Sequence, residues 1–102
     1  MTKTAKDYRI EWRPKAVDDL RAIVAYIGKD NPVKAREFGQ LLRNKVDSLA
    51  RHPESGRSGW PGLPKYVREL IVHPNYIVFY RLRAATRIAE ILRIKHVAQQ
   101  MP

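Results

Sequence analysis

At 102 residues, the chain has the length of one domain with a modest core, spanning residues 1–102, and is too short for two. Its 20 lysines and arginines against 10 acidic residues give a net charge of +10, while 44% hydrophobic residues exclude a disordered chain. It contains no cysteine, which excludes disulfides and thiolate metal sites and fits a reducing compartment.

The beginning of the sequence has no targeting pattern. The segment MTKTAKDYRIEW carries positive charge without an apolar run behind it, so we do not expect a secretory signal. No segment has enough consecutive apolar residues to span a bilayer. We therefore expect a soluble, cytoplasmic protein that does not associate with membranes.

The charge predicts the kind of partner. A small domain with this excess of basic residues attracts polyanions or an acidic protein. Arginine outnumbers lysine, which favours recognition of carboxylates or phosphates. The basic residues are spread along the chain without a block of like charges, which argues against a disordered nucleic-acid tail.

Residues 8–12 alternate apolar and charged side chains, which predicts a strand with one buried face. Pro14 suits the first position of a helix, whose first turn would hold Asp18 and Asp19 near the positive end of the helix dipole. Gly28 lies close to the expected end of this helix. Its apolar stripe consists of Ala16, Val17, Leu20, Ile23, Val24 and Ile27.

Asn31 and Pro32 are expected to cap and begin a second helix, which His52–Pro53 would close. The link between the two helices is so short that we expect an antiparallel hairpin. A loop rich in proline and glycine follows at residues 53–65. Trp60 within it either pins the loop to the domain or binds a partner, and the first interpretation is favoured.

Three strands are predicted after this loop, at residues 66–73, 76–83 and 88–96, and the last begins at Arg87 or Ile88. Tight turns separate them, so they form a meander. The order is strand, helix, helix, strand, strand, strand. This predicts an α+β fold, in which a small antiparallel sheet packs on a helical hairpin.

The last two strands carry the candidate binding surface. Period-two alternation places Arg81 and Arg83 on one face of their strand, and Arg93 and Lys95 on one face of the next. Pairing of the strands could join these four side chains into one basic face that contacts the target. The alternative is an ordinary solvated sheet face, and the register that decides which residues meet is not readable from the sequence.

The histidines and the strand carboxylates can be explained by structural roles as well as by functional ones. His52, His73 and His96 have no metal-ligand spacing, and no cofactor motif is present, so we expect neither a metal nor a cofactor. His73 and His96 fall at strand ends, where acid–base chemistry is one hypothesis and a turn hydrogen bond the favoured one. Glu69 and Glu90 are interpreted as neutralising neighbouring arginines.

Four segments resemble a known family: DDLRAIVAYI, LARHPESGR, RELIVHPNYIVFYRL and AEILRIKHVAQQMP. Together they resemble the RelE/ParE superfamily of bacterial toxins, the toxin halves of type II toxin–antitoxin modules, from about Tyr8 to Pro102. The resemblance implies one of two activities. RelE-like members cleave mRNA in the ribosomal A site without a metal, whereas ParE-like members inhibit DNA gyrase.

Individual positions favour the ParE-like branch. Arg68 matches a basic strand position of the nucleases, and His96 is the one substitute for their C-terminal tyrosine, so these two are the catalytic candidates if the chain is a nuclease. Other positions where the nucleases carry basic residues hold Leu70, Ile77, Val97 and Ala98. The acid–base pair that metal-free RNA cleavage requires is therefore not evident.

The resemblance also implies the partners. A ParE-like toxin of a plasmid-stabilising module would bind DNA gyrase, and a RelE-like toxin would bind the ribosome and mRNA. In both cases an acidic antitoxin would neutralise the basic charge and lay a helix along the apolar edges of the helical hairpin. A third hypothesis is a degenerate module that binds the antitoxin but is no longer toxic.

Overall fold

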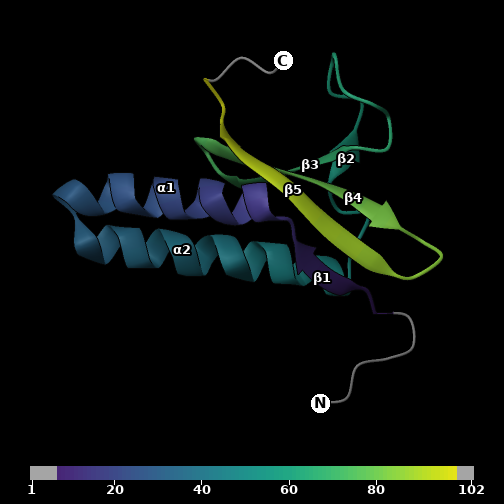
Figure 1. Ribbon diagram of the computed structural model, residues 1–102, viewed down its shortest axis with the longest axis horizontal. Helices are drawn as coiled ribbons and strands as arrows, with labels where there is room; N and C mark the ends of the chain where they lie inside the picture. Colours follow the sequence, from purple (N-terminus) through teal and green to yellow (C-terminus); the bar gives the residue numbers. More distant parts are fainter. Residues whose placement is uncertain (1–6, 99–102) are drawn as a thin grey trace.

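The structure is a computed structural model that describes residues 7–98. A helical hairpin covers one face of a five-stranded sheet (Figure 1). The elements are β1 (Arg9–Trp12), α1 (Pro14–Asp30), α2 (Pro32–Asp47), the 3-10 helix η1 (Ser48–Ala50), β2 (Arg57–Ser58), β3 (Arg68–His73), β4 (Tyr76–Arg83) and β5 (Ile88–His96). The predicted α+β class is confirmed. Within residues 7–98, none of the helices combines the length and apolar character that a membrane crossing requires.

The helical hairpin forms where the sequence predicts it. Pro14 lies in the first turn of α1, where a missing N–H leaves no hydrogen bond unmade. One residue, Asn31, separates the helices: its N–H closes α1, and its side-chain oxygen accepts from the N–H of Lys34 over 3.0 Å to cap α2. The helical path continues through η1 to Ala50, just before the predicted end at 52–53.

The sheet is mixed, which corrects the predicted antiparallel meander. Its order is β1-β5-β4-β3-β2. Strands β3, β4 and β5 pair antiparallel as predicted, but β1 pairs with β5 in parallel, and the two-residue strand β2 extends the sheet beyond β3. The sequence could not reveal these two pairings, because β1 and β5 lie at opposite ends of the chain and β2 lies within the segment predicted as a loop. The last four residues of the quoted AEILRIKHVAQQMP segment lie outside the described part of the chain.

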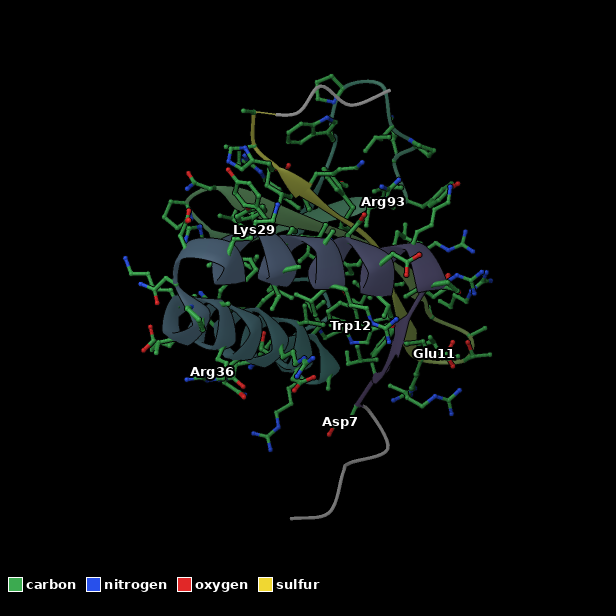
Figure 2. All side chains as sticks on the ribbon, turned by 60° about the vertical axis from the view of Figure 1, so that its left-hand side comes forward. Asp7, Glu11, Trp12, Lys29, Arg36 and Arg93 are labelled. Atoms are coloured by element: carbon green, nitrogen blue, oxygen red, sulfur yellow. The ribbon has the colours of Figure 1, made fainter. Side chains whose placement is uncertain are left out.

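The main hydrophobic core fills the space between the hairpin and the sheet. Trp12 of β1 packs against it, and Glu11 lies apart from it on the outer side of the strand, as period-two alternation predicts (Figure 2). The buried members are Ala16, Leu20, Phe38, Leu42, Val46, Leu49, Val72, Val78, Tyr80, Ile91 and Ile94. Burial of this apolar surface is the main stabilising contribution that joins the two layers.

Tyr80 and Arg68 fasten the loop after η1 to the sheet. The Tyr80 hydroxyl donates to the carbonyl of Pro53 over 2.7 Å and accepts from the N–H of Gly56 over 2.9 Å. Burial raises the pKa of the Tyr80 hydroxyl above its ordinary value. Arg68 Nη1 donates to the carbonyl of Gly56 over 2.7 Å. A Cβ at Gly56 would approach the carbonyl oxygen of Glu69 to 2.6 Å, so this position requires glycine.

A second, smaller cluster lies on the sheet face away from the helices. Its members are Val67, Ile77 and Phe79, with Trp60, Leu63 and Leu92 packed against them. The rings of Trp60 and Phe79 meet at 86° with centroids 5.4 Å apart. The prediction that Trp60 pins the loop is therefore confirmed. The loop cover also explains why β4 carries apolar residues on both faces.

Candidate functional site

A β-bulge divides the strands that carry the predicted basic face. Phe79 of β4 pairs with Arg93 of β5, but the next residue, Tyr80, pairs with Ile91. Leu92 is therefore an extra residue in β5, and it packs into the smaller cluster. The simple alternation predicted for β5 changes phase at this point.

The bulge separates the four predicted basic residues into two pairs. The pair next to the β4–β5 turn is Arg81 and Arg83, and the pair beyond the bulge is Arg93 and Lys95. Arg81 lies directly opposite Glu90, so the first pair surrounds a carboxylate. The structure thus places all four residues on neighbouring strands but gives the two pairs different surroundings.

Glu90 organises the first pair. Its side chain is 7% exposed, and its Oε1 accepts from Arg81 Nε and lies 3.1 Å from Arg83 Nε. Arg13 Nη1 approaches Oε2 from the start of α1 at 4.0 Å. The hydrogen bond from Arg81 and the charges of Arg81 and Arg83 hold the pKa of Glu90 below its ordinary value, against the opposing effect of burial. The prediction that Glu90 neutralises neighbouring arginines is confirmed, but three guanidinium groups share one carboxylate.

Tyr66 forms a wall beside this cluster. The residue is 59% exposed, and the centroid of its ring lies 5.5 Å from the guanidinium carbon of Arg81, within cation–π range. Tyr66, Arg81 and Arg83 line a hollow of about 370 Å³. The remaining lining residues are Leu82, Ala84, Ala85 and Thr86. Sequence reasoning did not find Tyr66 or Arg13 as site residues, because neither takes part in the alternation that marked the basic strands.

Arg93 has a different role from Arg81 and Arg83. Its Nε and Nη2 donate to the two carboxylate oxygens of Asp19 on α1, over 2.8 and 3.1 Å. The same carboxylate accepts from the N–H of Ile94 over 2.9 Å. Figure 2 shows Arg93 between α1 and the strands. Asp19 raises the pKa of Arg93 further above its ordinary value, and the paired guanidinium ties α1 to β5.

Asp19 corrects one expectation. The sequence suggested that Asp18 and Asp19 lie in the first turn of α1, but that turn contains no acidic residue because the helix begins at Pro14. Asp19 lies one turn further on and interacts with β5 rather than with the helix end. The other strand carboxylate, Glu69, is buried and pairs with Arg57 Nε over 2.6 Å, as expected for a neutralising residue.

The two nuclease candidates are not brought together. Arg68 lies opposite Tyr80 on one side of β4, and His96 lies opposite Tyr76 on the other side. These positions are four residues apart along β4, or about 13 Å at the usual strand rise. The Arg68 guanidinium also donates to the loop carbonyl of Gly56.

His73 and His96 meet instead around Tyr76. The centroid of the Tyr76 ring lies 5.8 Å from that of His73 and 5.1 Å from that of His96, and Phe38 completes the cluster at 5.1 Å from Tyr76. Nδ1 of each histidine accepts from the backbone N–H two residues later, over 3.0 Å. The turn hydrogen bond predicted for both histidines is confirmed. Among the described residues, no group of three or more histidine or acidic side chains could hold a metal.

Comparison with known proteins identifies the class to which this helical hairpin on a small mixed sheet, with arginines on β4 and β5, belongs. Residues 10–101 match the family described as "ParE toxin of type II toxin-antitoxin system, parDE", so the chain belongs to this family. It is 37% identical over 91 residues to the toxin RelE2 of Caulobacter vibrioides, covering 89% of this chain and 97% of that protein.

Solved structures share the fold. The chromosomal ParDE toxin–antitoxin system from P. aeruginosa matches with a TM-score of 0.77 and 25% identity, covering 91% of this chain and 99% of the other. The toxin–antitoxin complex RelBE2 from Mycobacterium tuberculosis matches with a TM-score of 0.60 and 21% identity, covering 88% and 98%, which supports the fold alone. The chain is thus a toxin of the ParE/RelE family.

Replacing Glu90 with glutamine should change the pH dependence of stability. The pKa of Glu90 is lowered on folding, so the stabilisation is fully present above the ordinary glutamate range and is lost as the pH falls through the lowered value. Glu90→Gln should reduce the free energy of unfolding at neutral pH by about 1–2 kcal/mol, the lower part of the range for charged hydrogen bonds because the arginines are partly exposed. Urea unfolding between neutral and acid pH measures both effects.

Glu37→Gln is the matched control, because Glu37 is exposed on α2. Its free energy of unfolding should fall toward acid pH as it does in the parent. A Glu90→Gln protein that lost stability toward acid pH as steeply as the parent would contradict the role of Glu90.

Proposed function

We propose that this toxin acts as a ParE-like protein: it binds and inhibits DNA gyrase in the cytoplasm and arrests growth, and a cognate acidic antitoxin neutralises it. The observation that carries this proposal is the separation of Arg68 from His96 across β4. The basic residues Arg81, Arg83 and Lys95 are proposed to contact the target.

The separation weighs against RNA cleavage by the two candidate residues. Metal-free cleavage needs a base, an acid and cations within hydrogen-bond reach of one phosphate. At about 13 Å along the strand, Arg68 and His96 cannot serve the same reacting atoms. Arg68 also holds the loop through Gly56, which is a structural role. An inhibitor that acts by binding requires no such constellation.

The alternative is a RelE-like, ribosome-dependent mRNA endoribonuclease, and one observation favours it. The cluster of His73, Tyr76 and His96 joins two imidazoles and a phenol, which are groups capable of acid–base chemistry. If the chain cleaves RNA, these residues rather than Arg68 are the catalytic candidates.

A single expression experiment separates the two functions. Cells that produce the toxin without its antitoxin should lose negative plasmid supercoiling while their transcripts remain intact. Plasmid topology on chloroquine gels and mapped mRNA 5′ ends are measured on the same arrested cells. Codon-phased mRNA cuts with normal topology, abolished by His96→Gln, would instead establish the nuclease.

The antitoxin is proposed to bind the groove between the two helices. This groove has a volume of about 620 Å³ and a mainly apolar lining that includes Trp12, Val17, Leu20, Val24 and Ala25. Arg21, Arg43 and Asp47 also line it, and the two arginines outnumber the one carboxylate and would attract an acidic amphipathic helix. The P. aeruginosa relative is part of a toxin–antitoxin system, which agrees with such a partner.

Ala25→Glu should weaken antitoxin binding by about tenfold or more, because it places an anionic side chain in the groove against the acidic helix, at a cost on the order of 1.4 kcal/mol. Ala25 is exposed, so the fold should remain intact. Calorimetric titration with the purified antitoxin measures the affinity. Ala22→Glu, at an exposed position on the same helix that does not line the groove, should bind like the parent. Equal weakening by both variants would exclude the groove.

A further inference from the structure

The arginine cluster around Glu90 has more positive charge than its carboxylate can neutralise. Arg13, Arg81 and Arg83 contribute three positive charges against the one carboxylate, and their side chains are 56%, 31% and 50% exposed. A guanidinium has five N–H donors. The contacts of Arg81 and Arg83 with Glu90 use Nε of both residues, so their terminal N–H groups remain for a ligand.

Glu90 also fixes the direction in which these donors point. The carboxylate is buried, and each guanidinium is held at its inner edge. Tyr66 supports the Arg81 guanidinium from one side. Arginine side chains that are already ordered lose less conformational entropy when they bind a ligand, which makes a prearranged cluster a better site than the same charges on free side chains.

The hollow beside the cluster is large enough to receive an acidic side chain. Its volume of about 370 Å³ is at the small end of the range for ligand sites. Leu82, Ala84 and Ala85 contribute apolar surface to its lining.

We propose that Arg13, Arg81, Arg83 and Tyr66 form a cradle for a glutamate or aspartate side chain in an acidic peptide segment of a protein partner. Glu90 is the positioning residue, since it acts through the arginines. The proposal deepens the proposed contact between the basic face and a protein target, and rests on that contact. It does not require the partner to be gyrase. Lys95 and Arg93 lie beyond the bulge and are not part of the cradle.

The test uses the purified full-length chain and an end-blocked hexaglutamate peptide. NMR spectra of the arginine Nε–H groups report directly on Arg81 and Arg83, whose Nε atoms contact Glu90. The peptide should shift these signals and the Tyr66 ring signals in a saturable manner. The Arg83→Gln and Tyr66→Leu proteins should each bind the peptide about fivefold more weakly, which is the upper end of the range for loss of one exposed charge contact.

Arg36→Gln is the matched control, because Arg36 is an exposed arginine on α2 and lies well apart from Glu11 and β1 (Figure 2). It should bind the peptide like the parent. Equal weakening by Arg36→Gln, or shifts spread over all arginines, would overturn the cradle in favour of diffuse attraction.

A thymidine hexanucleotide of similar charge is the second probe. Saturable binding of the nucleotide without binding of the peptide would overturn the proposal and indicate a nucleic-acid site. The peptide titration contains no gyrase, so a failure to bind the peptide would disprove the cradle without affecting the plasmid supercoiling measured in cells. Conversely, a failed gyrase assay would not remove measured peptide binding.

Discussion

The carboxylate of Asp19 joins the two layers of this toxin at an open part of the sheet. Strand β1 pairs with β5 only at Ile88–Ile91, so the following residues of β5 have no strand on that side. Asp19 accepts the N–H of Ile94 there and also binds both ends of the Arg93 guanidinium. A buried N–H without an acceptor costs about 1–3 kcal/mol. This contact therefore fixes where α1 crosses the sheet. The position of α1 in turn sets where the groove between the two helices lies relative to Arg81 and Arg83.

Glu90 uses the same chemistry with the opposite consequence. Asp19 engages Arg93 through two nitrogens, so that one carboxylate neutralises one guanidinium. Glu90 contacts Arg81 and Arg83 only through Nε and leaves their outer donors available. Basic residues that look equivalent in the sequence thus divide into one that ties the fold together and two that can bind a partner. What separates the two classes is that Arg93 has a carboxylate of its own, whereas Arg13, Arg81 and Arg83 share one.

The sequence predicted the local features well and the long-range ones poorly. Pro14 and the Asn31–Pro32 pair mark both helix starts because capping depends on neighbouring residues. The parallel pairing of β1 and the bulge at Leu92 depend on contacts between distant segments, so alternation could not reveal them. Glu90 was expected to neutralise neighbouring arginines, but the approach of Arg13 to it and the pairing of Arg93 with Asp19 were not predicted. Asp19, for example, is 74 positions from Arg93.

The division of the arginines is tested most directly by comparing Arg93→Gln with Arg83→Gln for growth arrest per folded molecule and for thermal unfolding. Arg93→Gln should unfold at a lower temperature while its folded fraction keeps the parent's toxicity. Arg83→Gln should unfold near the parent's temperature and lose most of its toxicity. A stable but inactive Arg93→Gln protein, beside a fully toxic Arg83→Gln protein, would contradict the account.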